Sequence, residues 1–175
     1  MVALKAGLAE VSEIMSVIRN IVDSYREPNL DFERFMSGEF EEKSALGFLA
    51  GGCFLAFISR WPPSARQSHL NDQALDIILG AALFGWVFVA PLLFYTLAGL
   101  LTVLFALFGL RQMGLAVRLS LFWSFLASAP VLLLFGLSGG FFGKGFLTTI
   151  VGLIWVGVFI WFLFCGFRAM WRKKI

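Results

Sequence analysis

Residues 77–110 read IILGAALFGWVFVAPLLFYTLAGLLTVLFALFGL, a run of 34 residues without a charged side chain. About 20 apolar residues are enough to cross a bilayer as an α-helix. As a helix the run would reach ~51 Å, against a hydrocarbon core of ~30 Å. It therefore predicts either one long helix that protrudes from a membrane or two short spans that turn near Pro91. One helix kinked at Pro91 is favoured, because a turn exposed to lipid would leave backbone groups unpaired.

The composition of the whole chain is that of an integral membrane protein. Hydrophobic residues make up 59% and charged residues only 14%, whereas soluble domains carry about 25% charged residues. Residues 1–43 hold nine acids and five bases, and residues 44–175 hold nine bases and two acids. We expect an amphipathic cytoplasmic segment at 1–43 and a membrane domain at 44–175. The chain has no basic stripe of the kind that binds nucleic acid, so no nucleic-acid partner is expected.

Three more apolar stretches flank the first one. The predicted spans lie at about 44–59, 77–110, 119–137 and 146–167. A polar loop is expected at 60–73 and a flexible glycine-rich loop at 138–145. The pattern predicts an all-α polytopic bundle of four transmembrane helices. Four spans leave both termini on one side, and the bases at Arg111, Arg118 and the C-terminus place that side in the cytoplasm.

Residues 2–26 predict an amphipathic helix that Pro28 ends. Its apolar residues recur at steps of four and three, so they share one face. This face consists of Leu4, Leu8, Val11, Met15, Ile18, Val22 and Tyr25. Two interpretations stay open: the helix lies on the protein's own membrane domain or at the lipid headgroups, or it forms a coiled-coil seam or a docking helix for a partner.

The third predicted span carries serines at a spacing of four. Ser120, Ser124 and Ser128 stack on one face, and small hydroxylated residues let helices approach closely and form hydrogen bonds. Such a strip either packs helices together or lines a path through the membrane. Pro130 follows the strip and, having no N–H, frees a backbone carbonyl one turn earlier that Ser124 or Ser128 could satisfy. Pro91 and Pro130 are the two predicted kinks.

The remaining candidate features indicate packing rather than chemistry. Gly47 and Gly51 form a GxxxG pattern in the first span, which is weak evidence in so apolar a chain. Cys53 and Cys165 both lie in apolar stretches without a second Cys or a His at ligand spacing, so we expect packing residues rather than a disulfide or a metal site. The predicted spans contain almost no His, Asp, Glu or Cys that could converge, so no enzyme, cofactor or metal site is expected.

Four sequence features follow one another in a fixed order. An acidic segment rich in Phe (Pro28 to Glu42) precedes the first span, and the overlong helix ends in Gly109-Leu110-Arg111. The next span carries Ser128-Ala129-Pro130, and a span with Gly and Trp (Gly152 to Trp161) comes last. In this order the chain resembles the small bacterial form of the Yip (Ypt-interacting protein) family over about residues 28–170, without the fifth span that members generally have. The resemblance implies a helical membrane fold in a bacterial inner membrane. The vesicle trafficking and Rab-type GTPases of eukaryotic members do not carry over to a bacterial cell.

From the sequence we expect a non-catalytic integral membrane protein that binds or organises membrane partners. The expected partners are membrane lipids together with another membrane protein or a second copy of the chain. The alternative is a small transporter or lipid-handling protein. In that alternative the strip from Ser120 to Ser128, with the kinks at Pro91 and Pro130, forms a path.

Overall fold

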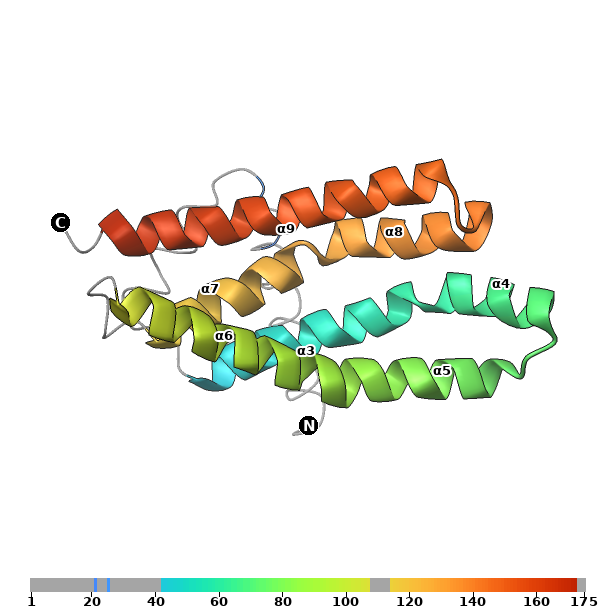
Figure 1. The fold of residues 1–175 in the computed structure, drawn as a ribbon, viewed down its shortest axis with the longest axis horizontal. Coiled ribbons are helices and arrows are strands. Elements are labelled where there is room, and N and C mark those ends of the chain that lie inside the picture. Colours follow the sequence, from blue (N-terminus) through green and yellow to red (C-terminus); the bar gives the residue numbers. More distant parts are fainter. Residues whose placement is uncertain (1–20, 22–24, 26–41, 108–113, 173–175) are drawn as a thin grey trace, which may run out of the picture.

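The computed structural model describes residues 21, 25, 42–107 and 114–172, and within these ranges the regular structure is entirely helical. In chain order the elements are α3 (Glu42–Ser59), α4 (Trp61–Asn71), α5 (Leu75–Phe84), the π-helical turn η1 (Gly85–Val89), α6 (Ala90–Leu107), α7 (Gly114–Ala127), α8 (Ala129–Phe142) and α9 (Phe146–Arg172). The helices run along one long axis, with the α4–α5 and α8–α9 turns at the same end (Figure 1). The expectation of an all-α bundle is confirmed for these residues.

The long apolar run forms one continuous helix. Its three pieces, α5, η1 and α6, span 33 residues from Leu75 to Leu107. The amide of Ala90 donates to the carbonyl of Gly85, five residues earlier, which closes the π turn directly before Pro91. A proline inside a helix removes a hydrogen bond and crowds the preceding turn, and a π turn is one way in which a helix absorbs that change. One helix was therefore the better of the two predicted arrangements.

Three helical segments are long and apolar enough to cross a membrane. They are Glu42–Asn71, Leu75–Leu107 and Phe146–Ala169. Helices α7 and α8 together would make a fourth span, but they are bent by 42° at Ser128. The described residues therefore contain fewer unbroken candidate spans than the four that the sequence predicts.

The predicted polar loop at 60–73 is wrong, because most of it is helix α4. Pro62 and Pro63 lie in the first turn of α4, where a missing N–H breaks no helical hydrogen bond. Asp72 ends α4 in the left-handed conformation, at φ 50°. The predicted loop at 138–145 is also shorter than expected, since α8 continues to Phe142.

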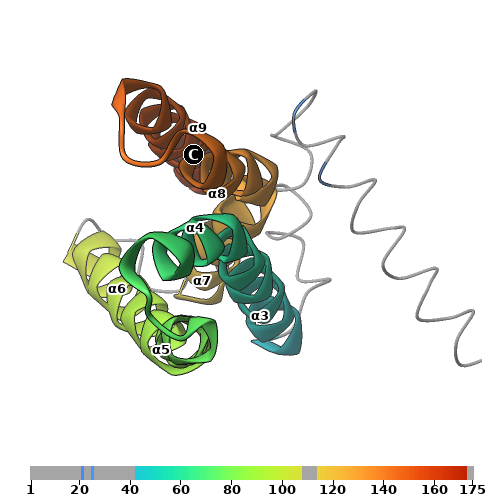
Figure 2. The same cartoon turned by 90° about the vertical axis from the view of Figure 1, so that its right-hand side faces the viewer.

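Helix α7 forms the centre of the bundle. Eleven of its 14 residues are buried, and it packs against α3, α6 and α9. End-on, α7 lies behind α4, with α3, α6 and α8 around it (Figure 2). Aromatic rings fill these contacts: Phe94 and Phe125 have ring centroids 4.5 Å apart, and Tyr95 and Phe122 have centroids 5.1 Å apart.

Two glycines of α8 bring that helix against the junction of α3 and α4. A Cβ atom on Gly136 would lie 1.9 Å from the carbonyl oxygen of Ser59, and one on Gly140 would lie 2.4 Å from Cβ of Pro62. Gly136 and Gly140 form the GxxxG pattern that permits this close approach. The pattern at Gly47 and Gly51 does not act in this way, since a Cβ on Gly47 would meet nothing within 4 Å.

Candidate functional site

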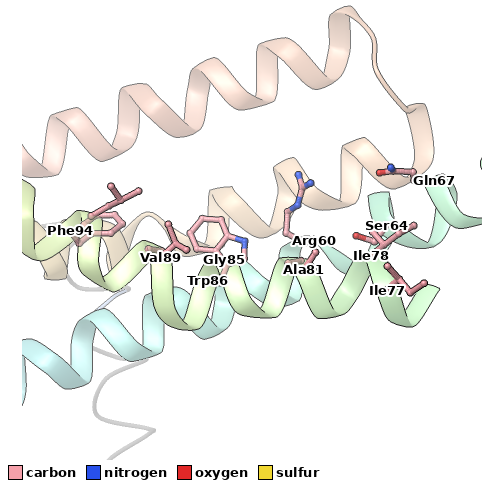
Figure 3. A pocket seen from close by; sticks show the side chains of 13 residues that line it. Arg60, Ser64, Gln67, Ile77, Ile78, Ala81, Gly85, Trp86, Val89 and Phe94 are labelled. Atoms are coloured by element: carbon pink, nitrogen blue, oxygen red, sulfur yellow. The ribbon is translucent and has the colours of Figure 1, made fainter. Parts of the chain in front are cut away.

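A groove of about 840 Å³ runs between α4 and the long helix α5–η1–α6. This volume falls in the range of about 300–1,000 Å³ that is usual for small-molecule sites. Its polar side chains, Arg60, Ser64 and Gln67, all come from α4 and the residue before it (Figure 3). The opposite wall consists of apolar residues and one glycine between Ile77 and Phe94. The groove is thus polar on one side and apolar on the other.

The polar side of the groove follows from helical geometry. Arg60, Ser64 and Gln67 are spaced at i, i+4 and i+7, so they share one face of the helix. Arg60 is the residue that caps the N-terminus of α4, and its carbonyl accepts a hydrogen bond from the amide of Ser64 at 3.0 Å. The sequence analysis missed this site because it assigned these residues to a loop. Their spacing was the signal that could have found it.

Aromatic contacts with α7 fix the inner part of the apolar wall. The ring of Trp86 stacks on that of Phe125 with centroids 6.2 Å apart, and the ring of Phe94 lies 4.5 Å from the same phenylalanine. Between Ile77 and Trp86 the wall carries small residues, among them Ala81 and Gly85, and these leave the groove hollow. The wall is therefore anchored to the core of the bundle on one side and open on the other.

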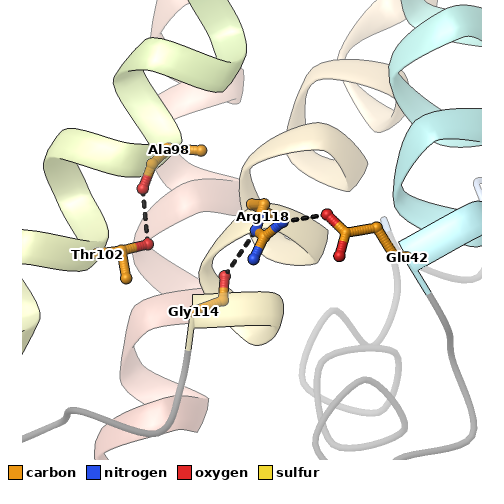
Figure 4. Close-up of polar contacts among 5 residues, drawn as sticks. All are labelled: Glu42, Ala98, Thr102, Gly114 and Arg118. Atoms are coloured by element: carbon orange, nitrogen blue, oxygen red, sulfur yellow. Dashed lines mark hydrogen bonds and ion pairs between the residues drawn. The ribbon is translucent and has the colours of Figure 1, made fainter.

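Arg60 is the only charged residue in the described lining of the groove, and its guanidinium forms no hydrogen bond or ion pair within the described ranges. Two other arginines are satisfied by the protein. Arg66 donates to the carbonyls of Gly140 and Phe141 at 3.4 Å and 3.2 Å. Arg118 forms an ion pair with Glu42 and donates to the carbonyl of Gly114 at 3.3 Å (Figure 4). The free donors of Arg60 therefore leave the groove able to hold an anion.

The predicted serine strip lies in the packed interior and does not line the groove. Ser120, Ser124 and Ser128 are at most 2% exposed. The hydroxyl of Ser124 donates to the carbonyl of Ser120 at 2.6 Å, and that of Ser128 donates to the carbonyl of Phe125 at 2.9 Å. These hydroxyls are satisfied by their own helix. Their role as packing or path residues stays a prediction.

Pro130 lies in the first turn of α8, next to the break between α7 and α8. The amide of Val131 donates to the carbonyl of Ser128 rather than to that of Ala127. The Ala127 carbonyl instead accepts a hydrogen bond of 3.0 Å from the hydroxyl of Tyr25. A residue far away in sequence thus satisfies a carbonyl at the break. The carbonyl that Pro130 itself frees is that of Leu126, one turn earlier, and its pairing with Ser124 or Ser128 stays a prediction.

The predicted docking face, Leu4, Leu8, Val11, Met15, Ile18 and Val22, lies outside the described residues. Tyr25, which shares that face in the sequence pattern, is described and contacts the bundle. Its ring meets that of Phe162 in α9 edge-on, with centroids 5.1 Å apart. Partial burial raises the pKa of the Tyr25 phenol, so the group stays protonated and able to donate. Tyr25 therefore lies against α9 and the junction of α7 and α8.

The other singled-out residues are not brought together. Pro91 follows the π turn, while Cys53 in α3 and Cys165 in α9 are free thiols. In the part of the chain that the structure describes, no three His, Cys, Asp or Glu side chains lie close enough to hold a metal ion.

Comparisons of the chain with family profiles, with curated proteins and with solved structures find no match. The resemblance to the Yip family stays a prediction that rests on the residues quoted above. No relative assigns a role to the groove, so its function has to be argued from its own side chains.

Proposed function

We propose that the chain is an integral membrane protein that acts without catalysis, by binding or organising partners within the bilayer. The observation that carries this proposal is the exposure of the long helix. Among the 33 residues of α5, η1 and α6, only Ala98 is buried. So large an apolar surface marks a lipid or protein interaction site.

The distribution of charge supports an orientation across the bilayer. Glu42 and Arg118 pair at one end of the bundle, Arg66 and Lys144 lie toward the end with the α4–α5 and α8–α9 turns, and Arg60 lies between α3 and α4. Glu42 and Arg60 are 18 residues apart along α3, which corresponds to about 27 Å of helix. This separation is close to the thickness of a hydrocarbon core, about 30 Å. We propose that both termini face the cytoplasm of a bacterial inner membrane, with α7 and α8 forming one broken span.

Two measurements test this placement. The chain should stay in the membrane fraction after alkaline carbonate washing, and a C-terminal alkaline phosphatase fusion should be inactive. Release by carbonate would contradict the membrane location. An active fusion would place the C-terminus outside and contradict the proposed orientation.

A photo-crosslinking experiment tests the organising role. A photoreactive side chain at Leu92 or Leu100, which are 69% and 66% exposed on α6, should capture the same membrane protein or a second copy of the chain. The control is Leu119, which is fully buried and should capture neither. Adducts with lipid alone at both exposed positions would contradict the organising role.

The groove favours a second candidate function, lipid handling. A polar rim beside a long apolar wall suits a molecule with a headgroup and a chain. If the protein moves lipid along this groove, Ala81→Phe, at an exposed residue of its lining, should abolish lipid flux in proteoliposomes while the protein still folds. Purified protein that moves no lipid would contradict this candidate.

A further inference from the structure

We propose that the groove binds one anionic phospholipid, with the phosphate on Arg60 and an acyl chain along α5–η1–α6. This inference rests on the proposed membrane location but not on the organising role.

Charge complementarity identifies the headgroup. The guanidinium of Arg60 has no partner within the described ranges, and no carboxylate belongs to the described lining of the groove. Asp72 lies 12 residues further along the chain, about 18 Å away along a helix. A guanidinium presents a planar fork of donors that matches phosphate oxygens in a bidentate manner. An anionic phosphate would therefore complete the hydrogen bonding of Arg60.

The polar face of α4 extends the headgroup site. Ser64 and Gln67 follow Arg60 by one and two helical turns and line the same groove (Figure 3). A hydroxyl and a carboxamide both donate and accept hydrogen bonds. They lie on the side of Arg60 away from Trp86 and Phe94 (Figure 3), so they suit the uncharged hydroxyls of a glycerol headgroup, which lies on the far side of the phosphate from the acyl chains. From Phe94 to Gln67 the groove thus presents an apolar wall, a cation and two neutral polar groups, which is the order of acyl chain, phosphate and glycerol headgroup in phosphatidylglycerol.

The apolar wall identifies the rest of the ligand. From Ile77 to Phe94 its side chains are apolar, and the small Ala81, Ala82 and Gly85 leave room along it. Arg60 lies beside Ala81 and Gly85 (Figure 3), so the chain has the part of the wall from Gly85 to Phe94, about 14 Å long as a helix and close to the half-thickness of a hydrocarbon core of about 30 Å. An acyl chain therefore fits along the wall without covering a charged group.

Arg60 is exposed, so the groove beside it, and not its own burial, separates this site from an arginine that only reaches into water. Arginines near the ends of membrane helices commonly extend to the interface and find any phosphate there. Arg60 differs in that its groove continues along Trp86 and Phe94, whose rings are held by Phe125. A headgroup on Arg60 would be joined to a chain in a fixed hollow, which predicts one retained lipid rather than general enrichment.

Native mass spectrometry provides the test. The full chain is reconstituted in vesicles of equal parts phosphatidylglycerol and phosphatidylcholine, and then extracted in mild detergent. We expect one phosphatidylglycerol per chain to be retained. Arg60→Gln should lower its retention about tenfold, because a hydrogen bond to a charged group is lost. Arg60→Lys, which keeps the charge but not the fork, should give an intermediate value.

Two matched controls isolate the site. Lys144→Gln removes the same charge from an exposed position between α8 and α9, outside the groove. This variant should leave retention unchanged. Ala81→Phe fills the groove and keeps Arg60, so it should abolish retention. Leu83→Phe adds a comparable ring at an exposed position that does not line the groove, and should have no effect.

Several outcomes would overturn the proposal. Equal losses in Arg60→Gln and Lys144→Gln would mean that only overall charge attracts lipid. Equal retention of phosphatidylcholine and phosphatidylglycerol would show that Arg60 does not select an anionic headgroup. Unchanged retention in Ala81→Phe would show that the lipid does not lie in the groove. Thermal unfolding of each variant shows whether it is folded, and the carbonate wash reports separately on the membrane location.

Discussion

Helix α7 and the helix α5–η1–α6 are both strongly apolar, yet they lie at opposite extremes of burial. Almost all of α7 is covered by other helices, whereas Ala98 is the single buried residue of the longer helix. Hydrophobicity therefore does not separate inside from outside in this protein. What differs is where the small and hydroxylated residues lie: Ser120 and Ser124 of α7 are buried between helices, whereas a Cβ added to Gly80 or Gly99 of the long helix would meet nothing within 4 Å. Packing in a bilayer depends on such residues rather than on apolar character.

The largest expected effect is at the glycine contact of α8. Gly136→Leu places a side chain where a Cβ already lies 1.9 Å from the backbone of Ser59. Because backbone cannot move aside as a side chain can, we expect the α3–α8 contact to open and the protein to lose its cooperative thermal unfolding in detergent. Gly99→Leu in α6 is the matched control, since a Cβ there meets nothing within 4 Å. If the two variants unfolded alike, the contact of α8 with α3 would be no more sensitive to an added side chain than the exposed face of α6.

A smaller loss is expected from removing the aromatic core. Phe125→Ala empties the contact with Trp86, Phe94 and Gly52, and should lower the free energy of unfolding by about 3 kcal/mol, as for buried aromatic residues elsewhere. Leu100→Ala on α6, which is 66% exposed, should change it by less than about 0.5 kcal/mol. Thermal or denaturant unfolding in detergent measures both. A larger loss from the α6 variant would show that α6 is covered in the folded protein.

The hydrogen bond at the break is expected to contribute less. Tyr25→Phe removes the donor to the Ala127 carbonyl and should cost about 1 kcal/mol, the usual net value of one hydrogen bond. Hydrogen exchange should rise for the amides near the start of α8 and not for those in the middle of α9. Unchanged exchange around Ser128 would mean that Tyr25 does not hold the break.

The smallest effect is expected at the ion pair on the rim of the bundle. Glu42 is 58% exposed at its side chain, and exposed ion pairs are worth about 0.2–1 kcal/mol. Glu42→Gln should therefore shift unfolding only slightly, and the shift should vanish at high salt. A loss that persists in molar salt would show that the pair is shielded from solvent and contributes more than a surface contact.

The sequence alone was sufficient for the broad features of the fold. The uncharged run from residue 77 predicts one long helix, because a lipid-exposed turn is costly, and the structure has that helix. Helix α4 was missed because a proline can either end the helix before it or lie in the first turn of the helix after it. Pro62 and Pro63 lie in the first turn of α4. Gly140 was assigned to a loop for the same reason, because glycine suits both a turn and a tight helix contact. Gly136 was placed in the third span, but no contact was predicted for it. Local sequence does not separate these roles, which depend on the neighbouring helix.

The groove and the contact of Tyr25 could not be predicted in the same way. The groove exists because α4 turns back beside α5, so its two walls are known only once both helices are placed. The Tyr25 bond joins residues 102 positions apart, and no periodicity links them. What the sequence does contain is the chemistry of each wall, namely the spacing of Arg60, Ser64 and Gln67 and the uncharged run opposite.

The π turn at Gly85–Val89 also sets the rotation of everything that follows it. A π turn accommodates one residue more than an α turn, and one residue corresponds to about 100° around the helix axis. Phe94 and Tyr95 face the rings of Phe122 and Phe125 only because that extra residue is present. Deleting a single residue between Gly85 and Val89 would restore a regular helix of nearly the same length and turn its aromatic side away from α7. The side of α6 that faces α7 thus depends on the five residues of the π turn, Gly85–Val89.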